Sequence, residues 1–187
     1  MINSIAARLP GHNLISHIST LSVHEYEQSN LASFQIMIRG LQSKLGIFDL
    51  PAFFRGKKLL DVGCGTGADM LRFRDLGAEV MGLDRQPMIR GKLCIKGDAT
   101  AMPLRSGQFD IVFSQHFTDL LTAEEFLGYS AESCRVLKPG GLFVVFDCFD
   151  EKSAELAAQA EKDTGFERIF FKGIESPLLI FKKPDQK

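Results

Sequence analysis

The 187-residue chain contains no tryptophan, only two tyrosines and only four cysteines. Cysteines 64, 94, 134 and 148 stand singly, so the sequence has neither a C-x-x-C pair for a metal nor the dense spacing of a disulfide framework. We therefore expect buried, reduced thiols in a cytoplasmic protein without a metal site.

Long hydrophobic runs are also missing. The longest apolar run is Leu142 to Phe146, whereas a membrane span needs about 20 residues. Residues 1–14 lack the continuous apolar segment of a secretory signal. The sequence thus predicts neither a membrane partner nor a leader peptide.

Net charge is nearly absent, because 22 Lys and Arg residues face 23 Asp and Glu residues. The chain therefore lacks the broad positively charged surface that is typical of nucleic-acid-binding proteins, and only a local basic patch remains possible. Apolar residues make up 45% of the chain, and a chain of this length buries roughly 70% of its unfolded surface. We expect one compact domain whose oligomeric state the sequence does not reveal.

From residue 57 onward, short apolar runs alternate with helical spacing, which indicates a parallel sheet with helices on both faces. Thr122 and Glu125 form a capping box for one of these helices. A Lys-Pro-Gly-Gly turn at 138–141 is expected to end that helix. The expected strands are 58–62, 78–83, 93–96, 109–114 and 142–146.

The last two apolar runs of the chain are spaced differently from those before them. Apolar runs at 166–172 and 176–182 are separated by only three residues, and so short a connection joins antiparallel neighbours. We therefore predict an α/β, doubly wound, mostly parallel seven-stranded sheet with one antiparallel strand. Upstream, apolar spacing predicts a helix from Ser29 or Asn30 to Gly46. Residues 1–28 are expected to form a flexible tail or lid, and residues 29–187 the domain.

A glycine-rich loop, Asp61-Val62-Gly63-Cys64-Gly65-Thr66-Gly67-Ala68, follows the first strand and opens a helix. Glycines let the backbone turn tightly and approach a ligand, and the first N–H groups of the helix point at that ligand. The spacing Gly63-x-Gly65-x-x-Ala68 also fits a dinucleotide site, and Asp84 lies where an acid would bind a ribose hydroxyl in either case. The loop alone therefore does not decide between a dinucleotide and another nucleoside ligand.

Asp61 separates the two alternatives physically. Next to a pyrophosphate its carboxylate would be repelled by about 4 kcal/mol per charge pair at 4 Å and an effective dielectric near 20. Next to a ligand with an ammonium and a sulfonium it would be attracted. The loop therefore favours a nucleoside with a positively charged tail.

Over residues 57–182 the chain resembles the class I S-adenosylmethionine-dependent methyltransferases, through L-L-D-V-G-C-G-T-G, G-L-D at 82–84, G-D-A at 97–99, Q-F-D-I-V at 108–112 and the closing strand pair. The resemblance implies that the glycines lie beneath the methionine tail of S-adenosyl-L-methionine and that Asp61 supports its ammonium group. Asp84 would hold the ribose hydroxyls, and Asp98 and the Ala99 N–H would meet the adenine. The full set of implied cofactor-binding residues is Asp61, Gly63, Cys64, Gly65, Gly67, Asp84, Arg85, Asp98, Ala99 and Ser114.

The sequence departs from the family between Asp84 and Leu93, where eight residues including Pro87 leave room for an irregular turn but not for a packed helix. We expect the adenine side to be less enclosed, or covered by residues 1–28.

His116 follows the fourth strand and is the candidate catalytic residue, a base for an acceptor that must lose a proton. A local hydrogen-bonding or packing role is the equal alternative. The small size of the chain outside the cofactor-binding region favours a small, apolar or aromatic acceptor. The rival functions are a non-catalytic S-adenosylmethionine-binding protein with a regulatory or assembly role, and a nicotinamide-dependent enzyme.

Overall fold

The computed structural model describes residues 23–88, 93–147, 149, 151–171 and 177–185. The chain divides into two compact units, Met1–Ile36 and Met37–Lys187. The whole sheet belongs to the second unit. Cys148 and the histidines at 12 and 17 lie outside the described residues.

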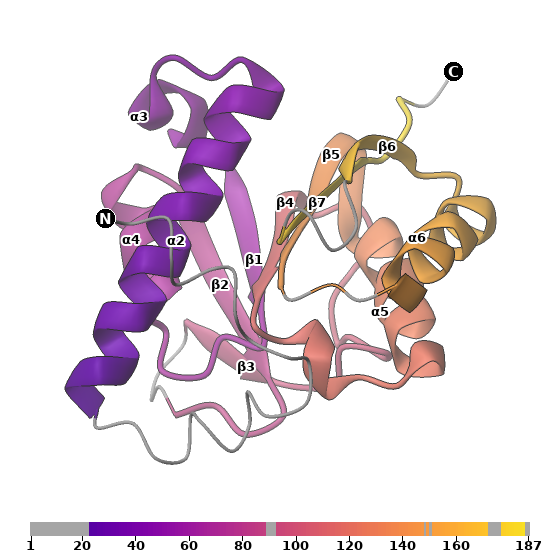
Figure 1. The fold of residues 1–187 in the computed structure, drawn as a ribbon, viewed down its shortest axis with the longest axis horizontal. Coiled ribbons are helices and arrows are strands. Elements are labelled where there is room, and N and C mark those ends of the chain that lie inside the picture. The colour runs from indigo at the N-terminus through magenta and orange to yellow at the C-terminus, as the bar shows by residue number, and fades with distance from the viewer. Residues whose placement is uncertain (1–22, 89–92, 148, 150, 172–176, 186–187) are drawn as a thin grey trace. The chain divides into compact units, whose positions relative to one another are not determined.

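The second unit is built on a seven-stranded sheet with the order β3-β2-β1-β4-β5-β7-β6 (Figure 1). Strand β7 pairs antiparallel with both β5 and β6, and the other pairs are parallel. The predicted sheet with one antiparallel strand is therefore confirmed. The strands are β1 (Lys58–Val62), β2 (Glu79–Asp84), β3 (Cys94–Lys96), β4 (Phe109–Gln115), β5 (Leu137–Phe146), β6 (Glu167–Phe171) and β7 (Leu178–Lys182).

Strand β5 begins five residues earlier than the sequence predicts. Residues 138–141 were expected to form a turn, but they lie within the strand. Leu137 already pairs with Phe109, and the register shifts before Leu142 pairs with Ile111. The predicted strand start was wrong because the proline and glycines form a bulge within the strand, in which Gly140 has a left-handed φ of 72° and donates its N–H to the Lys183 carbonyl at 2.9 Å.

The helices are α2 (Val23–Leu45), α3 (Leu50–Phe54), α4 (Ala68–Asp75), α5 (Ala123–Val136) and α6 (Glu151–Thr164), with a 3-10 turn η1 (Thr118–Leu120). Helix α2 starts at Val23 rather than at the predicted Ser29 or Asn30. Residues 23–28 contain neither glycine nor proline, so nothing in them breaks the helix before Ser29. Its predicted end is confirmed by Gly46, whose φ of 65° is left-handed.

Alternate residues of β4 face opposite layers of helices. Phe113 contacts Phe73 of α4 with ring centroids 5.0 Å apart, and Phe73 in turn meets Phe54 of α3 at 5.2 Å. On the other face, Tyr129 of α5 meets Phe143 of β5 at 5.1 Å. The sheet is thus covered on both faces, as the apolar strands require.

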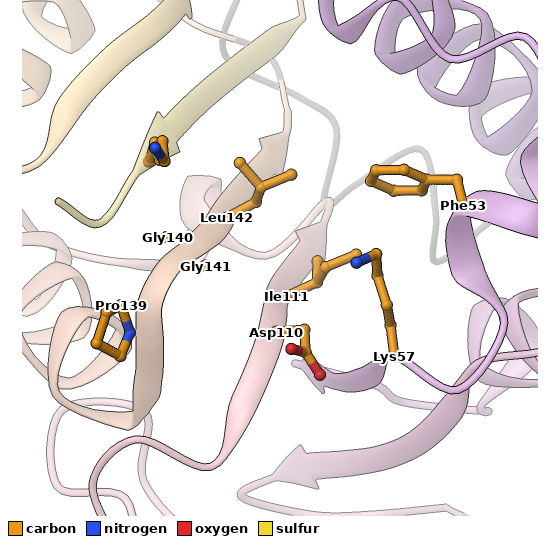
Figure 2. Close-up of a pocket in the computed structure, with 9 residues that line it drawn as sticks. Phe53, Lys57, Asp110, Ile111, Pro139, Gly140, Gly141 and Leu142 are labelled. Atoms are coloured by element: carbon orange, nitrogen blue, oxygen red, sulfur yellow. The ribbon is translucent and has the colours of Figure 1, made fainter. Parts of the chain in front are cut away.

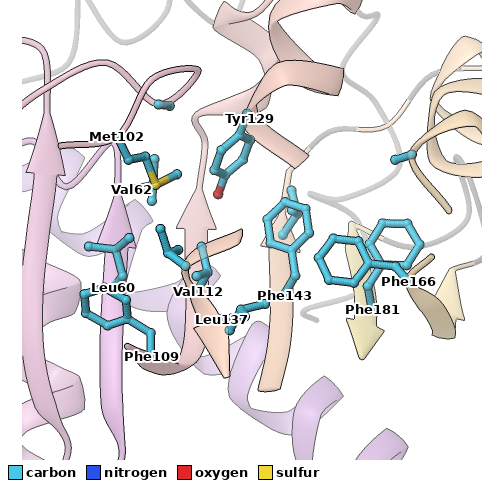
Figure 3. Close-up of a cluster of buried hydrophobic side chains, with 14 of the residues drawn as sticks. Leu60, Val62, Met102, Phe109, Val112, Tyr129, Leu137, Phe143, Phe166 and Phe181 are labelled. Atoms are coloured by element: carbon cyan, nitrogen blue, oxygen red, sulfur yellow. The ribbon is translucent and has the colours of Figure 1, made fainter. Parts of the chain in front are cut away.

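An aromatic cluster forms the core between the sheet and the α5–α6 layer. Figure 3 shows Tyr129, Phe143, Phe166 and Phe181 in a row, and the Phe166 and Phe181 rings stack at 5.3 Å and 4°. All four side chains are buried. Each buried aromatic ring removes a large apolar area from water and locks its neighbours. The carboxyl ends of β4 and β5 are therefore held on a rigid base.

Candidate functional site

The glycine loop has the backbone conformation that its sequence predicts. Gly63, Gly65 and Gly67 all have left-handed φ values, of 74°, 45° and 75°. A Cβ at Gly63 would lie only 2.5 Å from a ring carbon of Phe117, whereas at Gly65 the nearest heavy atom is 3.8 Å away. Phe117 therefore closes the loop at its start, whereas, among the described residues, Gly65 has only the Met88 side chain in ordinary van der Waals contact, so its backbone is less tightly covered.

Asp84 lies at the carboxyl end of β2, directly beside this loop. Its carboxylate accepts the Gly65 N–H at 3.0 Å and the Gln86 N–H at 2.7 Å. Because the carboxyl ends of β1 and β2 share one edge of the sheet, the loop and the acid predicted to bind ribose are brought together.

Carboxylates gather behind the loop. Asp61 is only 3% exposed. Burial raises the pKa of Asp61 well above its ordinary value, and the charges of Asp69 and Asp84 raise it further. A cation placed here would relieve that repulsion, whereas a pyrophosphate would add to it. These residues fit a cofactor with a positively charged tail.

Arg85 bridges two acids next to Asp84. Its guanidinium lies 3.0 Å from Asp98 and 3.1 Å from Glu125. The Thr100 N–H, which Asp98 accepts at 2.8 Å, is the main cause that lowers the pKa of Asp98, and Arg85 adds to it. Asp98 is therefore ionised and held at the end of β3, next to the buried Ala99, as its assigned place by the adenine requires.

The loop cysteine lies against a second thiol. The sulfur atoms of Cys64 and Cys94 are 3.1 Å apart, and both residues flank Gly82. Burial is the main cause that raises the pKa of both thiols. Cys64, Cys94 and Cys134 are free, as expected, although only Cys64 is fully buried. The protonated Cys64 thiol packs in the loop and is not a nucleophile.

His116 occupies a sharp bend after β4. Its φ of 51° makes it the one described non-glycine residue with a left-handed backbone. Its N–H donates to the Phe146 carbonyl at 3.0 Å, and its ring meets the Phe146 ring edge to face at 6.3 Å. The bend turns the chain out of the sheet at the same edge as the glycine loop.

Asp147, which sequence reasoning missed, holds the segment after His116. Its Oδ2 accepts the Thr118 N–H at 2.6 Å and the Thr118 hydroxyl at 2.7 Å, and it is 1% exposed. Asp147 directly follows β5, so the rule that singled out Asp84 and Asp98 would also have found it. Glu125 was recognised only as half of the capping box, which is confirmed.

Ser114 lies away from the other candidate residues. Its side chain is fully buried and points toward the α5 layer, beside Tyr129. The neighbouring Gln115, which was not among the candidates, faces the opposite layer and is 8% exposed. The structure thus brings the glycine loop, Asp61 and Asp84 together and places Asp98 and Arg85 beside them. Ser114 instead points toward the α5 layer.

A cavity of about 210 Å³ lies at the other, amino edge of the sheet (Figure 2). Phe53, Ile111 and Leu142 form apolar walls, and Lys57 extends into it. Asp110 is used structurally at this edge: it accepts the Lys58 N–H and the Lys138 ammonium, both at 2.8 Å. Open parallel sheets bind ligands at the carboxyl edge, so this cavity is not the candidate cofactor site.

The glycine loop after β1, the acid that ends β2 and the antiparallel β7 together define a class I S-adenosylmethionine-dependent methyltransferase domain, with S-adenosyl-L-methionine as its cofactor. Residues 60–145 match the family described as "Methyltransferase domain", and this part of the chain belongs to it. None of the described helices is long and apolar enough to cross a membrane.

Known proteins agree with this assignment. The chain is 30% identical over 142 residues to an uncharacterized methyltransferase of Synechocystis sp., covering 72% of this chain and 60% of that protein. It is 37% identical over 110 residues to the demethylmenaquinone methyltransferase of Renibacterium salmoninarum, covering 53% and 44%. The fold matches the Burkholderia thailandensis 1,6-didemethyltoxoflavin-N1-methyltransferase with a TM-score of 0.56 at 15% identity, covering 95% and 93%. The chain thus spans 60% or less of these two relatives in sequence.

Proposed function

We propose that the chain transfers the methyl group of S-adenosylmethionine to a small-molecule acceptor by in-line displacement. The observation that carries the proposal is the contact between the Gly65 N–H and Asp84 at 3.0 Å, with the buried Asp61 behind the loop. Together they offer a ribose-binding carboxylate and an attractive site for a cationic tail on one sheet edge.

When bound, the cofactor supplies an electrophilic methyl group on a sulfonium, and the protein's task is to align the acceptor with it. Asp84 binds the ribose hydroxyls, Asp98 accepts from the adenine amine, and the glycine loop holds the tail. His116 lies at the same edge and takes a proton from an acceptor that carries one. Asp147 keeps the segment after His116 in place through Thr118.

The proposed acceptor is a small, apolar or aromatic molecule. The Renibacterium relative is named for methylation of demethylmenaquinone. Phe117 lies directly at the loop and offers an aromatic wall. We further propose that residues 1–28 contribute acceptor recognition, because the sheet and its helices account for most of the remaining chain.

A labelled-methyl transfer screen against small metabolites and cell extract tests this function. The proposal predicts a labelled small molecule whose formation is lost in Asp84→Ala. Label found only in protein or nucleic acid would contradict the small-molecule acceptor.

A non-catalytic S-adenosylmethionine-binding role is the second candidate. It is favoured by one observation: residues 85–88, after Asp84, form no helix, as the sequence predicts, so this side of the site lacks a helical cover among the described residues. Saturable binding without turnover on any acceptor would support it.

A further inference from the structure

Gln115 is a buried side chain whose polar atoms are unsatisfied. It ends β4 and is 8% exposed, yet neither its Oε1 nor its Nε2 has a hydrogen-bond partner among the residues that the structure describes. A buried amide without partners destabilises the fold by about 1–3 kcal/mol. Such groups are rare in folded proteins and point to a missing ligand or water.

The register of the sheet places this amide at the candidate site. Asp61 of β1 pairs with Phe113 of β4, so these two residues share a face of the sheet. Side chains two residues apart point the same way, so Gln115 lies on that face too, one step closer to the carboxyl edge and next to Gly63. Strand spacing and rise put the Cα atoms of Asp61 and Gln115 about 8 Å apart.

The two side chains have complementary chemistry. The amino-acid tail of the proposed cofactor carries an ammonium and a carboxylate. Asp61 suits the ammonium, but a carboxylate needs a donor, and Asp61, Asp69 and Asp84 make this region negative. Arg85, the cation beside Asp84, is already bonded to Asp98 and Glu125. The Nε2 of Gln115 is a neutral donor on the same face as Asp61.

We propose that the Gln115 amide binds the carboxylate of the cofactor's amino-acid tail, opposite Asp61. This inference rests on the proposed function, because it assumes that S-adenosylmethionine binds at the glycine loop. It makes Gln115 a residue that selects a complete amino-acid tail over a truncated nucleoside.

The test is calorimetric titration of the full chain with three ligands. S-adenosylhomocysteine has the whole tail, decarboxylated S-adenosylmethionine lacks the carboxylate, and 5′-methylthioadenosine lacks the tail. The variants are Gln115→Met, which keeps the size but not the donor, and Gln115→Glu, which adds a repelling charge. Gln159→Met is the control, because that exposed amide on α6 bonds only to Asp163 at 2.6 Å.

We expect Gln115→Met to weaken S-adenosylhomocysteine binding about tenfold, the typical effect of a hydrogen bond to a charged group, and to leave 5′-methylthioadenosine within about twofold. Gln115→Glu should weaken S-adenosylhomocysteine further but should not weaken decarboxylated S-adenosylmethionine, whose tail carries only positive charges. Thermal melts identify a variant that does not fold, and the other variant then decides.

Equal losses for all three ligands, or no loss for S-adenosylhomocysteine, would overturn the role of Gln115 while the proposed function stands. If the unchanged protein binds none of the ligands, the proposed function fails as well, so the two failures are distinguishable.

Discussion

At the scale of single residues, the site depends on how the carboxylates lie relative to the backbone of the glycine loop. Asp84 does two things at once: it faces the place proposed for the ribose and it holds the Gly65 N–H at 3.0 Å. His116 is proposed to act only on the acceptor. The two residues are therefore expected to respond differently to substitution.

Asp84→Ala should weaken S-adenosylhomocysteine binding by about tenfold to a hundredfold, because it removes charge-assisted hydrogen bonds and frees the loop. His116→Ala should change that affinity by less than about threefold and instead lower methyl transfer to a protonated acceptor. Calorimetry measures the first effect, with Asp75→Ala, an exposed acid at the end of α4, as the control. Equal effects on cofactor affinity would contradict the assigned roles.

Gly82 is predicted to be irreplaceable for steric reasons. A Cβ there would lie 2.6 Å from the Cys64 sulfur and 2.7 Å from the Met70 sulfur, and overpacking of this kind costs about 1–3 kcal/mol. Gly82→Ala should lower the free energy of unfolding by this amount in urea titrations.

Gly128→Ala is the matched control for Gly82→Ala. It lies inside α5, its nearest atom would be 3.3 Å away, and alanine favours the helix. Its unfolding midpoint should stay close to that of the unchanged protein. A Gly82→Ala midpoint that is also unchanged would show that the contact around the two thiols is loose.

At the scale of elements, Asp110 links three strands at the amino edge. It accepts the N–H of Lys58 at the start of β1 and the ammonium of Lys138 in β5. Burial raises the pKa of Asp110, but the contacts with Lys138 and Lys58 outweigh it, so the net shift is downward. A carboxyl with a lowered folded-state pKa stabilises the protein above about pH 4, and that contribution is lost as the pH falls through the folded-state pKa.

Asp110→Asn should therefore reduce the free energy of unfolding by about 1–3 kcal/mol at pH 7, and the difference from the unchanged protein should shrink below about pH 4. Urea titrations at both pH values check this. Asp185→Asn, which breaks only the exposed pair with Lys182, should have no measurable effect. A difference that is constant with pH would mean that the charge of Asp110 is not what matters.

The elements also show how far the sequence could predict the fold and the site. The mostly parallel sheet and its one antiparallel strand follow from apolar runs and a three-residue connection. The early start of β5 did not, because a proline and two glycines indicate a turn, whereas here they form a bulge within the strand, with Gly140 in a left-handed conformation. The buried face of α5 includes Ser130 and Ser133, small polar residues that apolar spacing does not point to.

Within the site, the glycines and Asp84 could be predicted because their chemistry depends on local order along the chain. Asp147 could have been found by the same rule as Asp84, because it directly follows β5. Gln115 could not be singled out, because its role depends on which face of β4 its side chain takes. Ser114 shows the same limit: its position next to the catalytic candidate suggested a role at the cofactor, yet strand alternation turns it toward Tyr129.

At the scale of the whole molecule, we expect different parts of the chain to recognise the cofactor and the acceptor. The glycine loop and its acids belong to the unit Met37–Lys187, whereas acceptor recognition is proposed to involve residues 1–28. Deleting residues 1–22 should leave S-adenosylhomocysteine affinity within about twofold and lower methyl transfer at least about tenfold. A matching loss of affinity would place the N-terminal segment in the cofactor site, and thermal melts serve as the folding control.

The central claim is that this sheet edge binds a nucleoside with a cationic amino-acid tail rather than a dinucleotide. Calorimetric titration of the full chain with S-adenosylhomocysteine, with reduced nicotinamide dinucleotide in parallel, tests it most directly. The account predicts saturable one-to-one binding of S-adenosylhomocysteine, lost in Asp84→Ala, and no heat from the dinucleotide. Binding of the dinucleotide with no response to S-adenosylhomocysteine would contradict it.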